Sequence, residues 1–155
     1  MAEEQRPVRE VAFNRKARRD YEILDRLEAG LALQGTEVKT LRAGRVSLEE
    51  AYVKAEGGEL WLVACHIEEY AQGNIHNHDP LRPRKILVRK RELQRFRQRA
   101  REKGLTLIPI RIFFRGKWAK VEVGLARGRK RFDKREGIRK RETDRAMRRV
   151  RLRRR

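Results

Sequence analysis

Three side chains with the chemistry of metal ligands lie close together in the segment NIHNHDPLRPRK, at His76, His78 and Asp79. A His-x-His pair without a third firm ligand is a weak zinc signal. The single cysteine, Cys65, excludes an internal disulfide and a cysteine-based zinc site, and its run WLVACHI predicts a small buried strand residue. We therefore expect no metal site. A metal-dependent nuclease built on His76 and His78 is the alternative, which an RNA cleavage assay would reveal.

The sequence shows no pattern that is typical of an enzyme active site. It has no nucleophile beside a base and no carboxylate pair, and the glycines at 124 and 128 lack the spacing of either phosphate-binding fingerprint. We expect a non-enzymatic protein that uses no cofactor and takes no small-molecule substrate.

Arginine and lysine are in large excess, with 42 basic against 22 acidic residues and a net charge of +20. The last thirty residues carry 16 basic and 4 acidic side chains, a net of +12. This balance predicts a polyanionic partner. Because no apolar run is long enough to span a membrane and the N-terminus has no signal-peptide stretch, we expect a cytoplasmic protein that binds nucleic acid rather than a membrane.

A basic cluster in NRKARRDY, residues 14–21, lies where we expect a helix to begin. Basic side chains there oppose the helix dipole, so a bound anion would compensate them, whereas the alternative is a solvated helix face. The basic residues are Arg15, Lys16, Arg18 and Arg19. The aromatic residues that could stack on bases, if they are not core residues, are Tyr21, Tyr52, Trp61 and Trp118.

The elements that must position these residues are short. Apolar spacings of three and four predict an amphipathic helix over 19–30, ended by Gly30, and a second helix over 90–104. Ser47 and Glu50 fit a capping box, which predicts a short helical turn. Alternation predicts a strand over 30–41 with a bulge at Gly35, and hairpins over 51–67 and 105–126.

The segment 68–84 reads as a long loop. Its Asp79-Pro80 and Arg82-Pro83 pairs should stiffen it and aim Arg82, Arg84 and Lys85 outward. Together the elements predict a mainly β fold with helices, an OB-like antiparallel β-barrel of about six strands and two to three helices. An α+β sandwich fits the same periodicity nearly as well.

We expect two parts, a barrel over residues 1–127 and a basic C-terminal tail over 128–155. The tail has too few apolar residues to offset its ordering entropy, and its like charges repel at helical spacing. It should therefore be disordered when free and become helical when bound to polyphosphate.

Four segments resemble the SsrA-binding protein family, also known as small protein B (SmpB), and cover most of the chain in the family's order. They are NRKARRDYEI at 14–23, EAGLALQGTEVKTLRAG at 28–44, HDPLRPRKILV at 78–88 and AKVEVGLARGRKRFDKRE at 119–136. The resemblance implies a six-stranded OB-like barrel with a basic tail. It also implies a non-enzymatic partner of tmRNA, the RNA that rescues stalled ribosomes in trans-translation.

The resemblance further implies that the barrel grips the elbow of the tRNA-like domain of tmRNA. Glu28 would accept a hydrogen bond from a base or ribose, although its residue type alone favours a helix-end salt bridge. Arg89 replaces an Asn that is frequent in relatives, so a phosphate contact could stand in for an amide contact. The residues implied in RNA binding are Asn14, Arg15, Lys16, Tyr21, Glu28, Arg84, Lys85, Leu87, Arg89 and Lys120.

For the tail, the resemblance implies insertion into the empty decoding centre and mRNA channel of the ribosome, against 16S rRNA, in place of codon–anticodon pairing. Elongation factor Tu would assist delivery. Phe132 stands where many relatives have His or Tyr, so only stacking is available there. The implied tail residues are Gly128, Arg129, Lys130, Phe132, Asp133, Lys134, Arg135, Arg139, Lys140, Arg141, Arg145, Arg148 and Arg149. The alternative is a ribosomal or ribosome-assembly protein that binds rRNA, which has the same composition.

Overall fold

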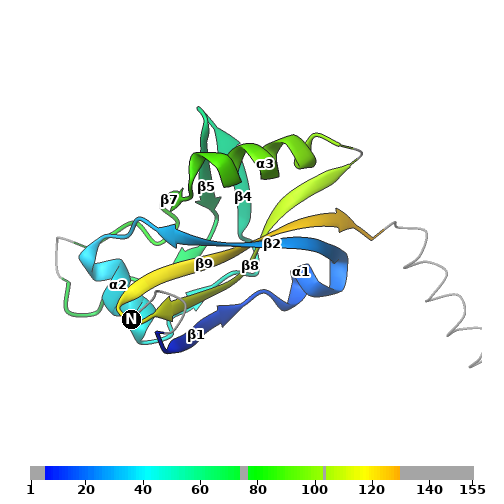
Figure 1. Cartoon of the computed structure of the whole chain (residues 1–155). Coiled ribbons are helices and arrows are strands. Elements are labelled where there is room, and N and C mark those ends of the chain that lie inside the picture. Colours follow the sequence, from blue (N-terminus) through cyan, green and yellow to red (C-terminus); the bar gives the residue numbers. More distant parts are fainter. Residues whose placement is uncertain (1–5, 74–76, 103, 130–155) are drawn as a thin grey trace, which may run out of the picture.

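The computed structural model describes residues 6–73, 77–102 and 104–129 (Figure 1). The helices of this part are α1 (Arg15–Asp20), α2 (Gly35–Arg42) and α3 (Lys90–Ala100). The strands are β1 (Val8–Phe13), β2 (Tyr21–Leu31), β3 (Val46–Ser47), β4 (Tyr52–Glu56), β5 (Glu59–Val63), β6 (His66–Ile67), β7 (Arg84–Leu87), β8 (Leu105–Arg115) and β9 (Trp118–Gly128).

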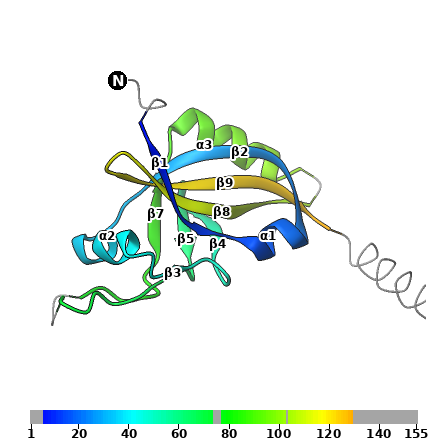
Figure 2. The ribbon, with the colours of Figure 1, turned by 90° about the horizontal axis from the view of Figure 1, so that it is seen from below.

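Seven strands form one antiparallel sheet in the order β1-β8-β9-β2-β7-β5-β4, and β3 pairs with β6 separately. The sheet curls, because its edge strand β4 also contacts β8 near the other edge. In Figures 1 and 2 the strands β7, β5 and β4 run across the direction of β8, β9 and β2, and α1 and α2 lie at opposite ends of the long strands. The expected mainly β fold, an OB-like antiparallel barrel with two to three helices, is confirmed, but the main sheet of the described part has seven strands where about six were expected.

The helix predicted over 19–30 is wrong, because residues 21–31 form strand β2. Leu27, Ala29 and Leu31 are buried at alternate positions, while Arg26 and Glu28 face solvent. The segment pairs with β9 along nearly its whole length, and this pairing favours a strand over the helix that the apolar spacings of three and four predict. Gly30 ends no helix and pairs with Leu87 of β7.

The strand predicted over 30–41 with a bulge at Gly35 is also wrong beyond Leu31, since α2 begins at Gly35. The backbone N–H of Gln34 donates to Oε1 of Glu37 at 2.8 Å, as in a capping box.

The predicted helical turn at Ser47 is a tight turn instead, closed by the Ala51 N–H donating to the Leu48 carbonyl at 3.0 Å. The helix predicted over 90–104 forms over Lys90–Ala100, and the two predicted hairpins form as β4–β5 and β8–β9.

The main core fills the barrel between the sheet and α3. Its buried residues come from every long strand and include Leu62, Phe96, Ile112, Val121 and Leu125. A smaller core lies under α1 and consists of Ala17, Ile108, Ile110 and Ala126. Across the described residues, no helix is both long and apolar enough to cross a membrane.

Phe96→Ala tests the packing of α3. Phe96 is fully buried, so its truncation should lower the free energy of unfolding by about 3–5 kcal/mol through lost burial and a cavity. Urea unfolding measures the loss. The control Gln98→Ala changes an exposed residue of the same helix and should stay within about 0.5 kcal/mol. Equal stabilities of the two variants would contradict this packing of α3.

Candidate nucleic-acid interface

A groove of about 400 Å³ follows the outer face of β2 and β9 to the start of α3, and we call it the strand groove. It brings together four of the predicted RNA-binding residues, Glu28, Leu87, Arg89 and Lys120. Its other lining residues are Arg26, Leu27, Ala29, Gly30, Val88, Glu92, Arg95 and Arg115. Three distant segments of the chain thus meet at one basic surface that also exposes an apolar side chain.

Gly30 explains why this groove is open. In the sheet Gly30 pairs with Lys120 on one side and with Leu87 on the other. A Cβ at Gly30 would lie 3.4 Å from the Leu87 Cβ, in van der Waals contact, so a side chain here would occupy the space between the two residues. Leu87 is half-exposed at the edge of the groove, so its side chain can be reached by a partner.

Glu28 is engaged in an ion pair across the strands. It accepts from Nε of Arg115 at 2.6 Å and remains partly exposed. The alternative of a salt bridge for Glu28 therefore holds, although the carboxylate lies in a strand and not at a helix end. Sequence reasoning missed Arg115, because only the β8–β9 register shows that it lies near β2.

A second groove, of about 650 Å³, lies between α1, the start of β4 and the end of β9, and we call it the helix groove. It brings together the predicted residues Asn14, Lys16, Tyr21, Gly128 and Arg129. β9 ends at Gly128, which pairs with Tyr21, and the Arg129 N–H donates to the Asp20 carbonyl at 2.9 Å. The described part of the chain therefore ends at this groove. The predicted residue Arg15 is exposed on α1 and does not line the groove.

Asn14 has a structural role in addition to its place in the groove. Its Oδ1 accepts from the Ala17 N–H at 3.1 Å and caps α1, while its Nδ2 donates to the Pro109 carbonyl at 2.9 Å. The side chain is buried. Asn14 therefore fixes α1 against β8, and the exposed basic residues of α1 depend on it for their position.

The prediction that Arg82 and Arg84 point outward is wrong. Arg84 is fully buried and donates from Nε to Oε2 of Glu37 and from Nη1 to the Cys65 carbonyl, both at 2.5 Å. Its Nη2 donates to the Pro80 carbonyl at 3.1 Å. Arg82 donates to the other oxygen of Glu37. Glu37, buried in α2, attracts both arginines inward, and nothing near 78–88 in the sequence shows this partner.

The pKa of Glu37 reflects two opposing effects. Burial raises the pKa, whereas hydrogen bonds from Arg82, the Gln34 N–H and Arg84, together with the charge of Arg84, lower it, and the net pKa is below the ordinary value. Burial likewise raises the pKa of the Cys65 thiol to about 11, so Cys65 is a buried thiol as predicted.

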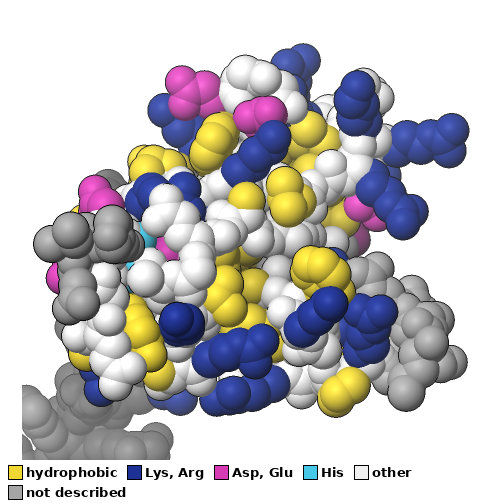
Figure 3. Space-filling view, turned by 90° about the vertical axis from the view of Figure 1, so that its left-hand side faces the viewer, with side chains coloured by type: hydrophobic (Ala, Val, Ile, Leu, Met, Phe, Trp, Pro, Cys, Tyr) yellow, Lys and Arg dark blue, Asp and Glu magenta, His cyan; other side chains and the backbone are white. Residues whose placement is uncertain are grey.

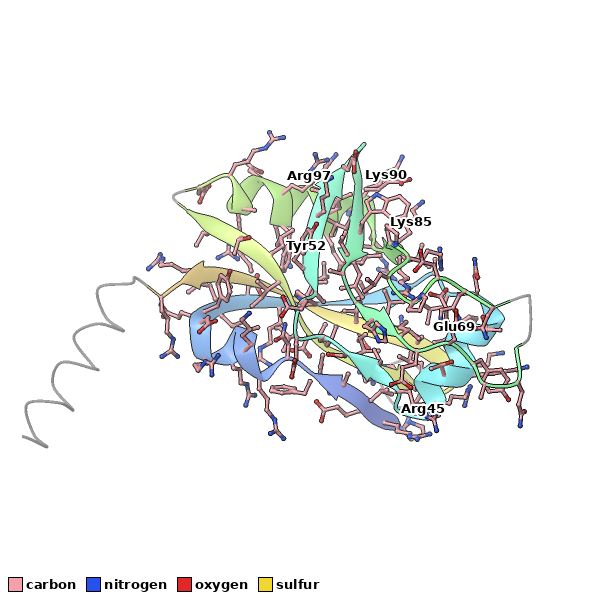
Figure 4. All side chains as sticks on the ribbon, turned by 180° about the vertical axis from the view of Figure 1, so that it is seen from behind. Arg45, Tyr52, Glu69, Lys85, Lys90 and Arg97 are labelled. Atoms are coloured by element: carbon pink, nitrogen blue, oxygen red, sulfur yellow. The ribbon has the colours of Figure 1, made fainter. Side chains whose placement is uncertain are left out.

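Lys85 is half-exposed on β7 beside β5 and pairs with Glu59 at 2.9 Å (Figure 4). Among the aromatic candidates, Tyr52 and Trp118 are each about half-exposed. Trp61 is more buried and lines a shallow groove with Tyr52 and Pro83.

His78 is a structural residue. It is buried, with Nδ1 2.9 Å from Oγ1 of Thr36 and Nε2 2.9 Å from the Ile67 carbonyl, so both ring nitrogens are engaged. Within residues 6–73, 77–102 and 104–129 no group of three or more His, Cys, Asp or Glu side chains is arranged to hold a metal ion. His76 lies outside the described residues.

Most of the predicted tail residues also lie outside the described residues. Only Gly128 and Arg129 are described. The others are Lys130, Phe132, Asp133, Lys134, Arg135, Arg139, Lys140, Arg141, Arg145, Arg148 and Arg149.

Basic side chains dominate the face of the molecule on the side of α2, with few acidic ones among them and some exposed apolar ones (Figure 3). A curled antiparallel sheet with a cationic groove on its outer face is typical of OB-type proteins that bind nucleic acids, and the fold and the strand groove define this class.

Comparisons with known proteins identify the family. The SmpB protein family model matches residues 11–153. The SsrA-binding protein of Carboxydothermus hydrogenoformans is 54% identical over 135 residues, covering 87% of this chain and 91% of the relative. That of Levilactobacillus brevis is 49% identical over 144 residues, covering 93% and 92%. A chain from the solved structure "tmRNA-SmpB: a journey to the center of the bacterial ribosome" is 48% identical with a TM-score of 0.67, covering 86% of this chain and 95% of that one. The chain belongs to the SmpB family.

Glu37→Gln tests the buried pair. It leaves Arg84 without its counter-charge and should cost about 3–5 kcal/mol of unfolding free energy at neutral pH. Because the folded-state pKa of Glu37 lies below the ordinary 4.5, its stabilising contribution is present above about pH 4.5 and is lost as pH falls through the folded-state pKa.

The stability difference between wild type and Glu37→Gln should therefore shrink in acid. Urea unfolding at several pH values between 7 and about 3 measures it. The control is Glu49→Gln, which changes an exposed glutamate in the turn before β4. A difference that grows on acidification would show that the folded state does not hold Glu37 as a carboxylate.

Proposed function

We propose that this protein is the RNA-binding adaptor of trans-translation. It binds the tRNA-like domain of tmRNA, delivers it to stalled ribosomes and places its C-terminal tail in the empty decoding centre and mRNA channel, where it substitutes for codon–anticodon pairing. Two similarities support this function: that to relatives named SsrA-binding protein, and that to a chain of the solved structure whose title names tmRNA-SmpB and the bacterial ribosome. The protein acts in the cytoplasm by binding and not by catalysis, and we expect elongation factor Tu in the delivery complex.

The observation that carries the proposal is the meeting of Glu28, Leu87, Arg89 and Lys120 around the strand groove. Basic side chains there can neutralise phosphates, and the exposed Leu87 can pack against a base or ribose. Glu28 is held by Arg115 with its carboxylate partly exposed, so it can also accept a hydrogen bond from RNA. Lys85, two residues before Leu87 on β7, extends this contact surface. Lys16 and Tyr21 in the helix groove, with Arg15 next to Lys16 on α1, add to it.

Arg84 and Asn14 contribute indirectly in this proposal. The guanidinium of Arg84 is buried, so it positions β7, which presents Lys85 and Leu87. Asn14 positions α1. The boundary between barrel and tail falls near Gly128, where β9 ends, and the net charge of +12 on residues 126–155 suits a channel whose walls are phosphate.

Sequencing the RNAs that copurify with the intact protein tests the function directly. One dominant tRNA-like species is the expected result. Recovery of bulk rRNA alone would overturn the adaptor in favour of a ribosomal or ribosome-assembly protein.

Leu87→Ser should weaken binding of the tRNA-like RNA about fivefold, because covering the exposed half of a leucine contributes about 1 kcal/mol. The fold should be unaffected, since the side chain is 50% exposed. Leu81→Ser is the matched control, as Leu81 is 54% exposed in a loop outside both grooves. Filter binding measures both variants, and equal affinities would remove Leu87 from the interface.

Truncation after Arg129 should leave most of the affinity for tRNA-like RNA while abolishing peptide tagging on stalled ribosomes. The physical reason is that the strand and helix grooves lie within the remaining barrel. An in vitro tagging assay and RNA binding measure the two activities. Tagging that persists, or RNA affinity lost together with tagging, would contradict this division between barrel and tail.

A further inference from the structure

A third groove, of about 400 Å³, lies on the same outer face of the sheet, between β1, α1 and the centre of β8 and β9. Its lining is mostly arginine and glutamate, and we call it the arginine groove. It is lined by Glu10, Phe13, Arg18, Arg26, Arg111 and Glu122. Arg26 also lines the strand groove, so the two grooves adjoin at this residue.

Glu122 fixes two of the three arginines. Its Oε1 accepts from Arg26 Nη1 at 3.0 Å, and its Oε2 accepts from Arg111 Nε at 2.9 Å. The Glu122 side chain is 12% exposed, whereas that of Arg26 is 52% exposed. One shielded carboxylate therefore holds two guanidinium groups side by side, and each keeps further N–H donors that Glu122 does not use.

Arg18 brings a further positive charge to the groove, whose lining also includes Glu10. Its guanidinium stacks over the Phe13 ring at 4.7 Å from the centroid, and among the described residues it forms no ion pair. Arg111 is stacked in the same way, 4.3 Å from the Phe113 centroid. Stacking on an aromatic face restricts a guanidinium before a ligand arrives, which lowers the entropic cost of binding.

These contacts favour an anion as the occupant. The lining arginines exceed the lining glutamates by one charge, and both oxygens of Glu122 are already engaged. Planar guanidinium groups with fixed N–H donors match the geometry of a phosphate group. A base would find little apolar surface here, since Phe13 lies beneath Arg18.

We propose that the arginine groove binds a phosphodiester group of the same RNA that occupies the strand groove, with Arg18 and Arg111 as its phosphate-binding residues and Glu122 as their positioning residue. This inference rests on the proposed function. It extends the contact surface from the β2–β7 side of the sheet across β9 and β8 to α1.

The test measures binding of the full-length protein to a transcribed tRNA-like RNA over a series of salt concentrations. Arg18→Gln and Arg111→Gln should each weaken binding on the order of tenfold and reduce the log–log salt slope by about 0.7–0.9, the value for one lost phosphate contact. Arg18→Lys should keep the slope and lose part of the affinity, because it retains the charge without the fork.

Arg45→Gln is the matched control, since Arg45 is an exposed arginine outside all three grooves. It should leave affinity and slope close to wild type. Thermal unfolding checks each variant. Arg18 is exposed and forms no ion pair in the described part of the chain, so its variant should fold even where Arg111→Gln does not.

The outcomes separate the two proposals. If the wild-type protein does not bind the tRNA-like RNA, the proposed function fails. If wild type binds and Arg18→Gln matches it in affinity and slope, the arginine groove is overturned while the proposed function stands. If Arg18→Gln weakens only binding to ribosomes and leaves binding to the isolated RNA unchanged, the proposed role of the arginine groove is also overturned.

Discussion

The buried pair between Glu37 and Arg84 is the interaction on which the arrangement of this barrel most depends. It ties α2 to β7, and the remaining donors of Arg84 hold the Cys65 carbonyl, before β6, and the Pro80 carbonyl, within the loop that leads to β7. A fully buried charge is tolerated only when it is paired and its hydrogen bonds are satisfied, so the loop, α2 and β7 must come together as a unit. β7 then carries Lys85 and Leu87 to the surface next to Gly30.

On the outer face of the sheet, carboxylates also hold arginines in place, although these side chains are less buried than Glu37 and Arg84. Glu28 holds Arg115, and Glu122 holds Arg26 and Arg111, so a few carboxylates give fixed positions to side chains that would otherwise be mobile. The net charge of the whole chain is +20, and on this face Glu28 and Glu122 together orient three arginines. Such a surface presents guanidinium groups to RNA with less conformational entropy left to lose than free surface arginines would have.

The sequence predicts what short-range patterns determine. The β4–β5 hairpin follows from Gly57-Gly58, the β8–β9 hairpin from alternation, and α3 from the spacing of Leu93, Phe96 and Ala100. The predictions are wrong where a partner far away in the sequence determines the local structure. Residues 21–31 have apolar spacings that suit a helix, but β9 offers pairing along almost the whole segment and a strand forms. Arg84 looks like a surface residue until Glu37, 47 positions away, is placed beside it.

The candidate site could be predicted only in part for the same reason. The resemblance to a family selected Glu28, Leu87 and Lys120, but composition and spacing do not show that they surround one groove. That geometry depends on the registers of β2 with β7 and β9, which place the side-chain-free Gly30 between Leu87 and Lys120. Arg111 and Glu122 carried no signal in the sequence, because each is an ordinary charged residue in an alternating strand. Only their pairing opposite each other across β8 and β9 turns them into a charged surface that continues the strand groove. The extent of an RNA contact surface on such a barrel is therefore set by strand register more than by any local motif.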